Sequence, residues 1–485
     1  MHRPPCILWF RQDLRLADHP ALAAALRHGV VVPLFILDET APGGWPQGAA
    51  KRWWLHGSLA ALDHALRTIG SRLVLRRGPA AAVLDEVIRE TGATAVAWSR
   101  CYEPGAIARD KAIKAALRAR GVAVESVNGS LLVEPWDIAT GAGKPYAVFT
   151  PFWKALRGRG DPPAPLPAPT TLPVPAAMPK SDALEDWRLL PTAPDWAGGL
   201  RAAWVPGEAG ARAALMEFLD HGLAGYAQQR DRPDIDGTSR LSPYLGLGAI
   251  GPRQVWHAVQ SRAAAHPGQG GAAEAYLREL GWREYAYHLL YHWPDLPERN
   301  WRDGFEHFPW RADYSALQAW QRGMTGYPIV DAGMRQLWQT GWMHNRVRMI
   351  AASFLIKDLL IHWRTGEDWF WDTLVDADLA VNAASWQWVA GTGADAAPYF
   401  RVFNPVLQGR KFDPHGDYVR RFVPELARLP ADHIHEPWTA PADVLRQAGV
   451  ALGRDYPRPI VDHAQARLRA LAAFKALGKA DEAAD

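Results

Sequence analysis

The residue types that could do chemistry are concentrated between residues 341 and 403. This stretch contains six tryptophans, an Asp-x-Asp pair formed by Asp376 and Asp378, and Asn382. If it is helical, Asp378, Asn382 and Trp386 recur at four-residue steps and share one face. A wall of polar heads and an indole suits a large planar ligand with a hydrogen-bonding rim. A core helix with an acidic cap and buried indoles fits the spacing equally well.

The run from Met349 to Trp363 predicts a continuous buried helix beside this wall. It contains no glycine or proline, and its core positions fall at three- and four-residue steps, at Ile350, Phe354, Leu355, Leu359 and His362. We therefore expect a single helix from Met349 through Trp363.

A second cluster, ELGWREYAYH, runs from Glu279 to His288. On a helix, Glu279, Trp282 and Arg283 share one face and offer a carboxylate, an indole plate and a guanidinium to a single pocket. From these residues alone, a salt-bridged amphipathic surface helix is the commoner meaning of the pattern.

Small hydroxyl residues form a third cluster, GTSRLS, at residues 237–242 just before Pro243. Backbone N–H groups and hydroxyls at the start of a helix can hold an anion, so a pyrophosphate could bind there. Serine and threonine are also common helix caps, which is the simpler interpretation.

The composition is that of a soluble globular protein of two to four domains, with 485 residues, 48% hydrophobic and 22% charged. Two cysteines, Cys6 and Cys101, support neither a disulfide framework nor a metal site, and they fit a reducing cytoplasm. No apolar run reaches the length of a membrane span, and no signal peptide is evident. A net charge of +3 is weak evidence for a polyanion partner, whereas 24 tryptophans suggest stacking or redox roles.

The elements that must position these clusters follow from periodicity. Up to residue 127, short apolar runs alternate with helical patterns, which predicts a doubly wound parallel sheet. Asp18 is a plausible N-cap for the first helix, and no GxGxxG follows the first strand. We expect an α/β domain at residues 1–130, a proline-rich linker at 131–200, and an all-helical domain at 201–478.

Four of the late motifs, together with both ends of the chain, resemble the DNA photolyase and cryptochrome family, class I type. They are WMHNRVRM (342–349), DADLAVN (376–382), SWQW (385–388) and TGADAAPYFRVFNP (392–405), with LWFRQDLRLADHPAL (8–22) and YPRPIVDHAQAR (456–467) at the ends. Because the resemblance covers nearly the whole chain, it is more specific than a single short motif. It implies an antenna domain of Rossmann type followed by a helical FAD-binding domain.

The resemblance implies roles for individual residues. FAD would be bound by Tyr226, Thr238, Ser239, Arg240, Leu241, Ser242, Tyr276, Arg283, Asn345, Arg348, Asp376, Ala377, Asp378 and Asn382. The reacting bases would meet Glu279, Trp282, Asn345 and Trp388, and DNA would also be contacted by Arg230, Arg346 and Arg401. Electrons would reach the flavin through Trp310, Trp363 and Trp386. Arg348 is placed to pair with Asp376, and the neutral amide of Asn382 at flavin N5 favours a repair-type flavin.

The implied activity is light-driven splitting of cyclobutane pyrimidine dimers in UV-damaged DNA by a monomeric cytoplasmic enzyme without a metal. A methenyltetrahydrofolate antenna is expected near KRWWLH (51–56), and a deazaflavin or no antenna is the alternative, because Gly105 and Ala106 stand where some folate-binding members carry Asn and Glu. The packing of Trp53, Trp54 and His56 between helix and sheet is the simpler interpretation of that segment. A cryptochrome-like blue-light sensor and a (6-4) photolyase are the alternative functions.

Overall fold

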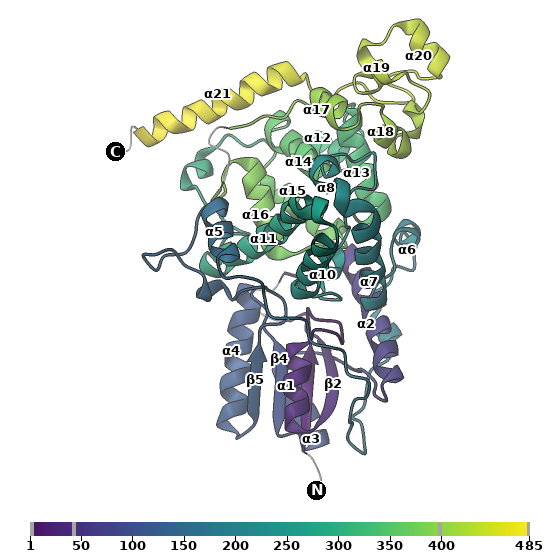
Figure 1. Cartoon of the computed structure of the whole chain (residues 1–485). Helices are drawn as coiled ribbons and strands as arrows, with labels where there is room; N and C mark the ends of the chain where they lie inside the picture. Colours follow the sequence, from purple (N-terminus) through teal and green to yellow (C-terminus); the bar gives the residue numbers. More distant parts are fainter. Residues whose placement is uncertain (1–3, 41–44, 396–399, 483–485) are drawn as a thin grey trace. The chain divides into compact units, whose positions relative to one another are not determined.

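Five short apolar strands form a parallel sheet in the N-terminal part of the chain (Figure 1). The structure, a computed structural model, describes residues 4–40, 45–395 and 400–482, with side chains up to residue 477. The strands are β1 (Pro5–Phe10), β2 (Val30–Leu37), β3 (Val74–Arg77), β4 (Ala95–Ser99) and β5 (Ala123–Val127), in the order β3-β2-β1-β4-β5. In the register, Trp9 of β1 lies between Leu34 of β2 and Trp98 of β4.

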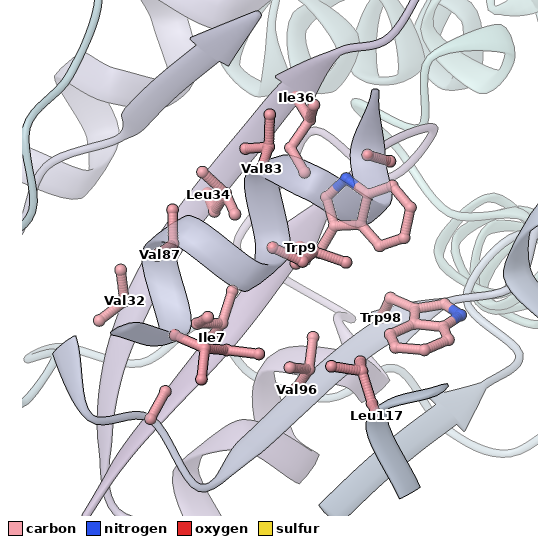
Figure 2. Packing of buried hydrophobic residues seen from close by; sticks show 14 of the residues in the cluster. Ile7, Trp9, Val32, Leu34, Ile36, Val83, Val87, Val96, Trp98 and Leu117 are labelled. Carbon is pink, nitrogen blue, oxygen red and sulfur yellow. The ribbon is translucent and has the colours of Figure 1, made fainter. Parts of the chain in front are cut away.

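Helices alternate with these strands and cover both faces of the sheet. They are α1 (Pro20–His28), α2 (Ala49–Thr68), α3 (Ala80–Thr91) and α4 (Pro104–Ala119). On one face, Trp9 and Trp98 pack with Val83 and Val87 of α3 and Leu117 of α4 (Figure 2). The intervening β1 side chains point to the other face, where α1 packs on β1 and β4. The predicted doubly wound sheet is confirmed.

The expected N-cap of the first helix is wrong by one residue. His19 caps α1, because its Nδ1 accepts a hydrogen bond from Leu22 N at 3.0 Å. Asp18 is fully buried with a positive φ of 51°, and its carboxylate accepts bonds from Leu166 N and from the guanidinium of Arg253. Tertiary contacts therefore occupy the side chain that the local pattern assigned to the cap.

Contacts divide the chain into two compact units. Unit 1 contains Met1–Ala224, Ser239–Pro294 and Val375–Ala380, and unit 2 contains Gly225–Thr238, Asp295–Leu374 and Val381–Asp485. Unit 1 adds α5 (Phe149–Arg157), α6 (Gly198–Ala203), α7 (Glu208–Glu217), α9 (Ser242–Gly246), α10 (Pro252–Ala265) and α11 (Gly270–His292), with short helical turns at Pro135–Asp137, Leu184–Trp187, Phe218–Gly222 and Pro267–Gln269. Residues 158–183, all of them described, contain no helix or strand, as the prolines predicted. The three domain boundaries expected from the sequence stay a prediction.

Unit 2 contains helices and no β-strand in the residues that the structure describes. Its helices are α8 (Tyr226–Gln229), α12 (Tyr314–Gln321), α13 (Pro328–Thr340), α14 (Asn345–Ser353), α15 (Trp363–Thr373), α17 (Pro405–Phe412), α18 (Asp417–Phe422), α19 (Ala431–Ile434), α20 (Ala442–Ala448), α21 (His463–Glu482) and most of α16 (Leu379–Ala390). Shorter turns lie at Asp303–His307, Phe354–Asp358, Pro424–Leu426 and Pro437–Thr439, and the turn Leu223–Gly225 crosses the sequence boundary between the two units. Phe305, Phe308 and Phe400 form an apolar cluster with α21.

The continuous helix expected from Met349 to Trp363 is wrong. The chain leaves α14 through a π-helical turn, Phe354–Asp358, and reverses at Leu360, whose φ is +56°. A new helix, α15, begins at Trp363 and is capped by His362. The turn contains two buried polar residues, Lys357 and Asp358, and Asp358 Oδ1 lies 2.5 Å from His463 Nδ1 of α21. The apolar spacing continues across the break because both helices bury their faces in one core.

Candidate functional site

Helix α11 carries four of the predicted site residues. Tyr276, Glu279, Trp282 and Arg283 lie within Gly270–His292, with Tyr276 buried and the other three half-buried. The ring of Trp282 stacks on Phe149 of α5, with ring centroids 3.6 Å apart and planes 10° from parallel. An apolar ring thus backs one face of the indole and fixes its plane, as a stacking platform requires. The sequence reasoning missed Phe149, which lies far from Trp282 along the chain.

The predicted phosphate-binding segment is a strained loop more than a helix start. Arg240 has a positive φ of 50°, which is costly for a residue with a side chain and typical of functional loops. The hydroxyl of Tyr276 donates to Ser239 Oγ at 2.9 Å and so orients the serine. The helix expected after Ser242 has only five residues. Loop hydroxyls and N–H groups would therefore do more for an anion here than the dipole of so short a helix.

The Asp-x-Asp pair lies outside the helix, although the spacing predicts Asp378 on its face. Helix α16 begins at Leu379, so Asp376 and Asp378 precede it, and only Asn382 and Trp386 share its face one turn apart. Asp378 is nearly buried, and its Oδ2 accepts a 2.6 Å hydrogen bond from the phenol of Tyr287. The Ala377 carbonyl accepts a 2.5 Å bond from the ammonium of Lys51. Asp376, Ala377 and Asp378 therefore lie in an irregular segment of unit 1 that is held by hydrogen bonds from Tyr287 and Lys51.

Asn382 and Trp386 extend from α16 towards α15 in unit 2. Asn382 Nδ2 donates to the carbonyl of Glu367 at 3.1 Å, and the Glu367 carboxyl is fully buried. Burial raises the pKa of Glu367 well above its usual range. A Cβ on Gly366 would lie 2.1 Å from the indole of Trp386, so only glycine lets the two helices approach this closely.

The three tryptophans of the predicted electron route all belong to unit 2. Trp386 and Trp363 are buried, and of the three indoles Trp310 alone is half-buried. The ring of His362 lies 5.6 Å from Trp363 and 4.8 Å from Trp310. The imidazole, which the sequence reasoning did not assign to the route, therefore lies between two of the indoles.

Two of the predicted DNA contacts of unit 2 are arginines that already contact other side chains of the protein. Arg346 forms a 2.8 Å ion pair with Asp231 and lies over the ring of Phe412, and Arg230 lies over the ring of Tyr226. Asn345 is exposed at the first position of α14. Arg348 Nε donates to the Met343 carbonyl at 2.7 Å, and its expected pairing with Asp376 of unit 1 stays a prediction.

Trp388 and Arg401 line one pocket of unit 2 together with Lys357 and Phe400. Lys357 is buried, donates to the Arg401 carbonyl and lies 4.5 Å from the centroid of the Phe400 ring. Burial lowers the pKa of Lys357 to about 7. Nothing in the apolar run around Lys357 marked it as part of this pocket. Residues 396–399 of the TGADAAPYFRVFNP motif lie outside the described residues.

The segment expected to hold an antenna is largely core. Trp53 and Trp54 of α2 are buried, and Trp54 packs edge-on against Tyr244 at 5.0 Å, whereas His56 is half-buried. Trp54 therefore packs on Tyr244 of α9, whereas the simpler interpretation expected packing against the sheet. Unit 1 also contains a cavity of about 310 Å³, and its lining includes Asn128, Glu134, Asp137, Arg159 and Trp256. That volume lies at the lower end of the range for ligand sites.

The described residues contain no cluster of His, Cys, Asp or Glu side chains that could hold a metal ion. Cys6 and Cys101 are free thiols in the core, and burial raises their pKa to about 12. No helix in the described part of the chain is long and apolar enough to cross a membrane.

Two family models match the chain. The model described as DNA photolyase matches residues 6–170, and the model described as the FAD binding domain of DNA photolyase matches residues 276–476. The deoxyribodipyrimidine photo-lyase of Agrobacterium fabrum is 55% identical over 98% of this chain and 98% of its own length. Cryptochrome-1 of Arabidopsis thaliana is 41% identical over 95% of this chain and 69% of its own length.

A solved structure of similar shape is described as a bacterial class III photolyase from Agrobacterium tumefaciens. It has a TM-score of 0.96 and 55% identity, and the match covers 99% of this chain and 98% of that one. The class I type expected from the motifs is therefore not established, whereas the family is.

Proposed function

The chain belongs to the DNA photolyase and cryptochrome family and carries its FAD-binding domain, and we propose that it splits cyclobutane pyrimidine dimers in DNA with light. The observation that carries the proposal is the platform formed by Trp282 on Phe149, with Glu279 on the same helix. A flipped base needs a rigid plate and a polar group at its edge. A cryptochrome-like blue-light sensor of the same family is the alternative function. Such a sensor does not have to hold an extruded base, so it needs no such plate.

The donor set fits FAD in its chemistry. Hydroxyl and N–H groups of residues 238–242 suit the pyrophosphate, and the carboxylate of Asp378 suits a hydrogen-bond donor at the flavin edge or sugar. When bound and reduced, FAD supplies an electron to the dimer under blue light and takes it back after the ring has opened. The remaining groups assigned to the cofactor are Tyr226, Tyr276, Arg283, Asn345, Arg348, Asp376, Ala377 and Asn382.

The chain's own side chains bind and orient the lesion in this proposal. Trp282 stacks on the extruded pyrimidines, and Trp388 contacts them from its own pocket. Glu279 hydrogen-bonds their Watson–Crick edge and stabilises charge developing on the dimer. Arg230, Arg346 and Arg401 hold phosphates without reading sequence. A damaged pair stacks poorly, so extrusion costs least at the lesion.

The test is repair of UV-irradiated oligothymidine by the FAD-loaded, fully reduced protein. We expect blue light to remove dimers and darkness to leave them. A Glu279→Ala, Trp282→Ala double variant, loaded with FAD in the same way, is the matched control and should not repair. If the wild-type protein binds and reduces FAD but leaves the dimers intact under blue light, the sensor or (6-4) activity takes the place of this proposal.

We also propose an antenna chromophore, methenyltetrahydrofolate, with a deazaflavin as the alternative. The cavity lined by Trp256, Arg159 and Asn128 supports it, because it joins an indole and a cation to hydrogen-bonding groups. Mass spectrometry of acid-released chromophores, after expression in a folate-replete host, should find folate beside FAD. Recovery of FAD alone would contradict this part of the proposal.

A further inference from the structure

We infer that Tyr287 and Lys51 are positioning residues that fix the cofactor-facing segment Asp376–Asp378. The inference rests on the proposed function, because that segment acts on FAD only if FAD is bound. Tyr287 donates its phenol to Asp378 Oδ2 at 2.6 Å, and Lys51 donates its ammonium to the Ala377 carbonyl at 2.5 Å. All of these residues belong to unit 1.

The segment needs external anchors because it has no regular structure of its own. It lies between the end of α15 at Thr373 and the start of α16 at Leu379. Irregular segments open locally at low free energy unless side chains from elsewhere hold them. The two donors come from helices remote in sequence, Lys51 from α2 and Tyr287 from α11. Each anchor therefore ties the segment to a rigid element.

The phenol of Tyr287 can act as a fixed donor because its ring is held on two sides. The guanidinium of Arg283 lies 4.8 Å above the ring centroid, and the ring of Tyr102 meets it edge-on at 6.1 Å. Arg283 is fixed in turn by a 2.8 Å bond to the Ser130 carbonyl. Tyr102 donates to Glu134 at 2.8 Å. Removing one hydroxyl from Tyr287 would leave this packing intact.

The protonation state of Tyr287 also suits a donor. Burial, and then the charge of Asp378, raises the pKa of Tyr287 well above its usual range. The phenol therefore keeps its proton at neutral pH. A hydrogen bond from a neutral phenol to a carboxylate at this distance is charge-assisted and strong. It orients the carboxylate.

The experiment measures FAD affinity and flavin midpoint potential in the full-length protein. In Tyr287→Phe, we expect the dissociation constant for FAD to rise about tenfold, since hydrogen bonds to charged groups are of that strength. The midpoint potential should shift as well, because the orientation of a carboxylate near the flavin changes. Tyr291→Phe is the matched control: it lies one turn along α11 and should change neither quantity.

Two further variants keep the inference open to contradiction. Lys51→Met keeps the alkyl packing and should also weaken FAD binding. In a double-mutant cycle, Tyr287→Phe should add little to Asp378→Asn, because the tyrosine acts through the aspartate. Unchanged affinity and potential in Tyr287→Phe, or full additivity with Asp378→Asn, would overturn the inference. Failure of the wild-type protein to bind FAD would instead overturn the proposed function.

Discussion

An ion pair within the protein competes with DNA phosphate for one of the arginines predicted to contact DNA. Arg346 is paired with Asp231 at 2.8 Å, and the side chains are 19% and 36% exposed. A phosphate must compete with this carboxylate for the guanidinium. The carboxylate of Asp231 therefore occupies the guanidinium of Arg346 in the absence of DNA. Its effect on DNA binding can be measured.

We predict that Asp231→Asn strengthens binding of damaged and undamaged DNA alike, by about two- to fivefold, as expected for the loss of a partly exposed ion pair. Fluorescence anisotropy with both duplexes measures this. Asp455→Asn, which removes the partner of the exposed Arg454, is the control and should have no effect. Weaker binding in Asp231→Asn would mean that the aspartate positions Arg346 for DNA.

Replacing Glu279 and replacing Trp282 should impair different steps, repair in the first case and lesion binding in the second. Glu279→Ala should lower repair per absorbed photon more than binding, because the carboxylate stabilises charge that develops only during the reaction. Trp282→Ala should weaken lesion binding most, by about ten- to a hundredfold for the loss of base stacking. Quantum yields at saturating DNA, measured beside dissociation constants, separate the two. The same pattern of loss in both variants would contradict these roles.

Buried Lys357 should make stability depend on pH. Its folded pKa is about 7, below that of a free lysine, because burial disfavours the charged form. Between about pH 7 and pH 10 the unfolded chain binds more protons at this site, so its contribution to stability rises with pH. We predict that the free energy of unfolding of the wild type rises relative to Lys357→Met over pH 7–9.5, by up to a few kcal/mol. If plots of the free energy of unfolding against pH, measured with urea, are parallel for the two proteins, the lowered pKa of Lys357 is contradicted.

At the scale of elements, the sequence predicts what depends on local pattern. The alternation of strands and helices up to residue 127 was predicted correctly, because apolar runs and helical periodicity are local signals. The break at Leu360 was missed because the apolar spacing does not change when one buried helix replaces another. The contacts Trp282–Phe149 and Tyr287–Asp378 join distant parts of the chain, and no local pattern encodes them.

The close approach of α15 and α16 at Gly366 sets the place of Trp386, and this bears on the electron route. We predict that Trp386→Phe, a change that keeps most of the packing, slows photoreduction of the oxidised flavin. Trp438→Phe, an aromatic contact of Tyr327 elsewhere in unit 2, is the control. Transient absorption of the FAD-loaded protein measures the rate. An unchanged rate in Trp386→Phe would show that electrons take another path.

At the scale of the whole molecule, net charge alone does not explain affinity for DNA. A net charge of +3 over 485 residues gives little general attraction to a polyanion. Binding must therefore come from a few local phosphate contacts, and the salt dependence counts them, because each contact releases counterions. Arg346 and Arg401 are two such contacts in our proposal.

We predict that Arg346→Ala and Arg401→Ala each reduce the slope of log K against log salt by about one unit, and that the double variant reduces it by about two. Damaged and undamaged DNA should lose affinity to a similar degree, because phosphate contacts carry no information about the lesion. Arg454→Ala, whose side chain is 79% exposed and pairs with Asp455, is the control and should leave the slope unchanged. A loss confined to damaged DNA, with an unchanged slope, would mean that these arginines contact the extruded bases and not the backbone.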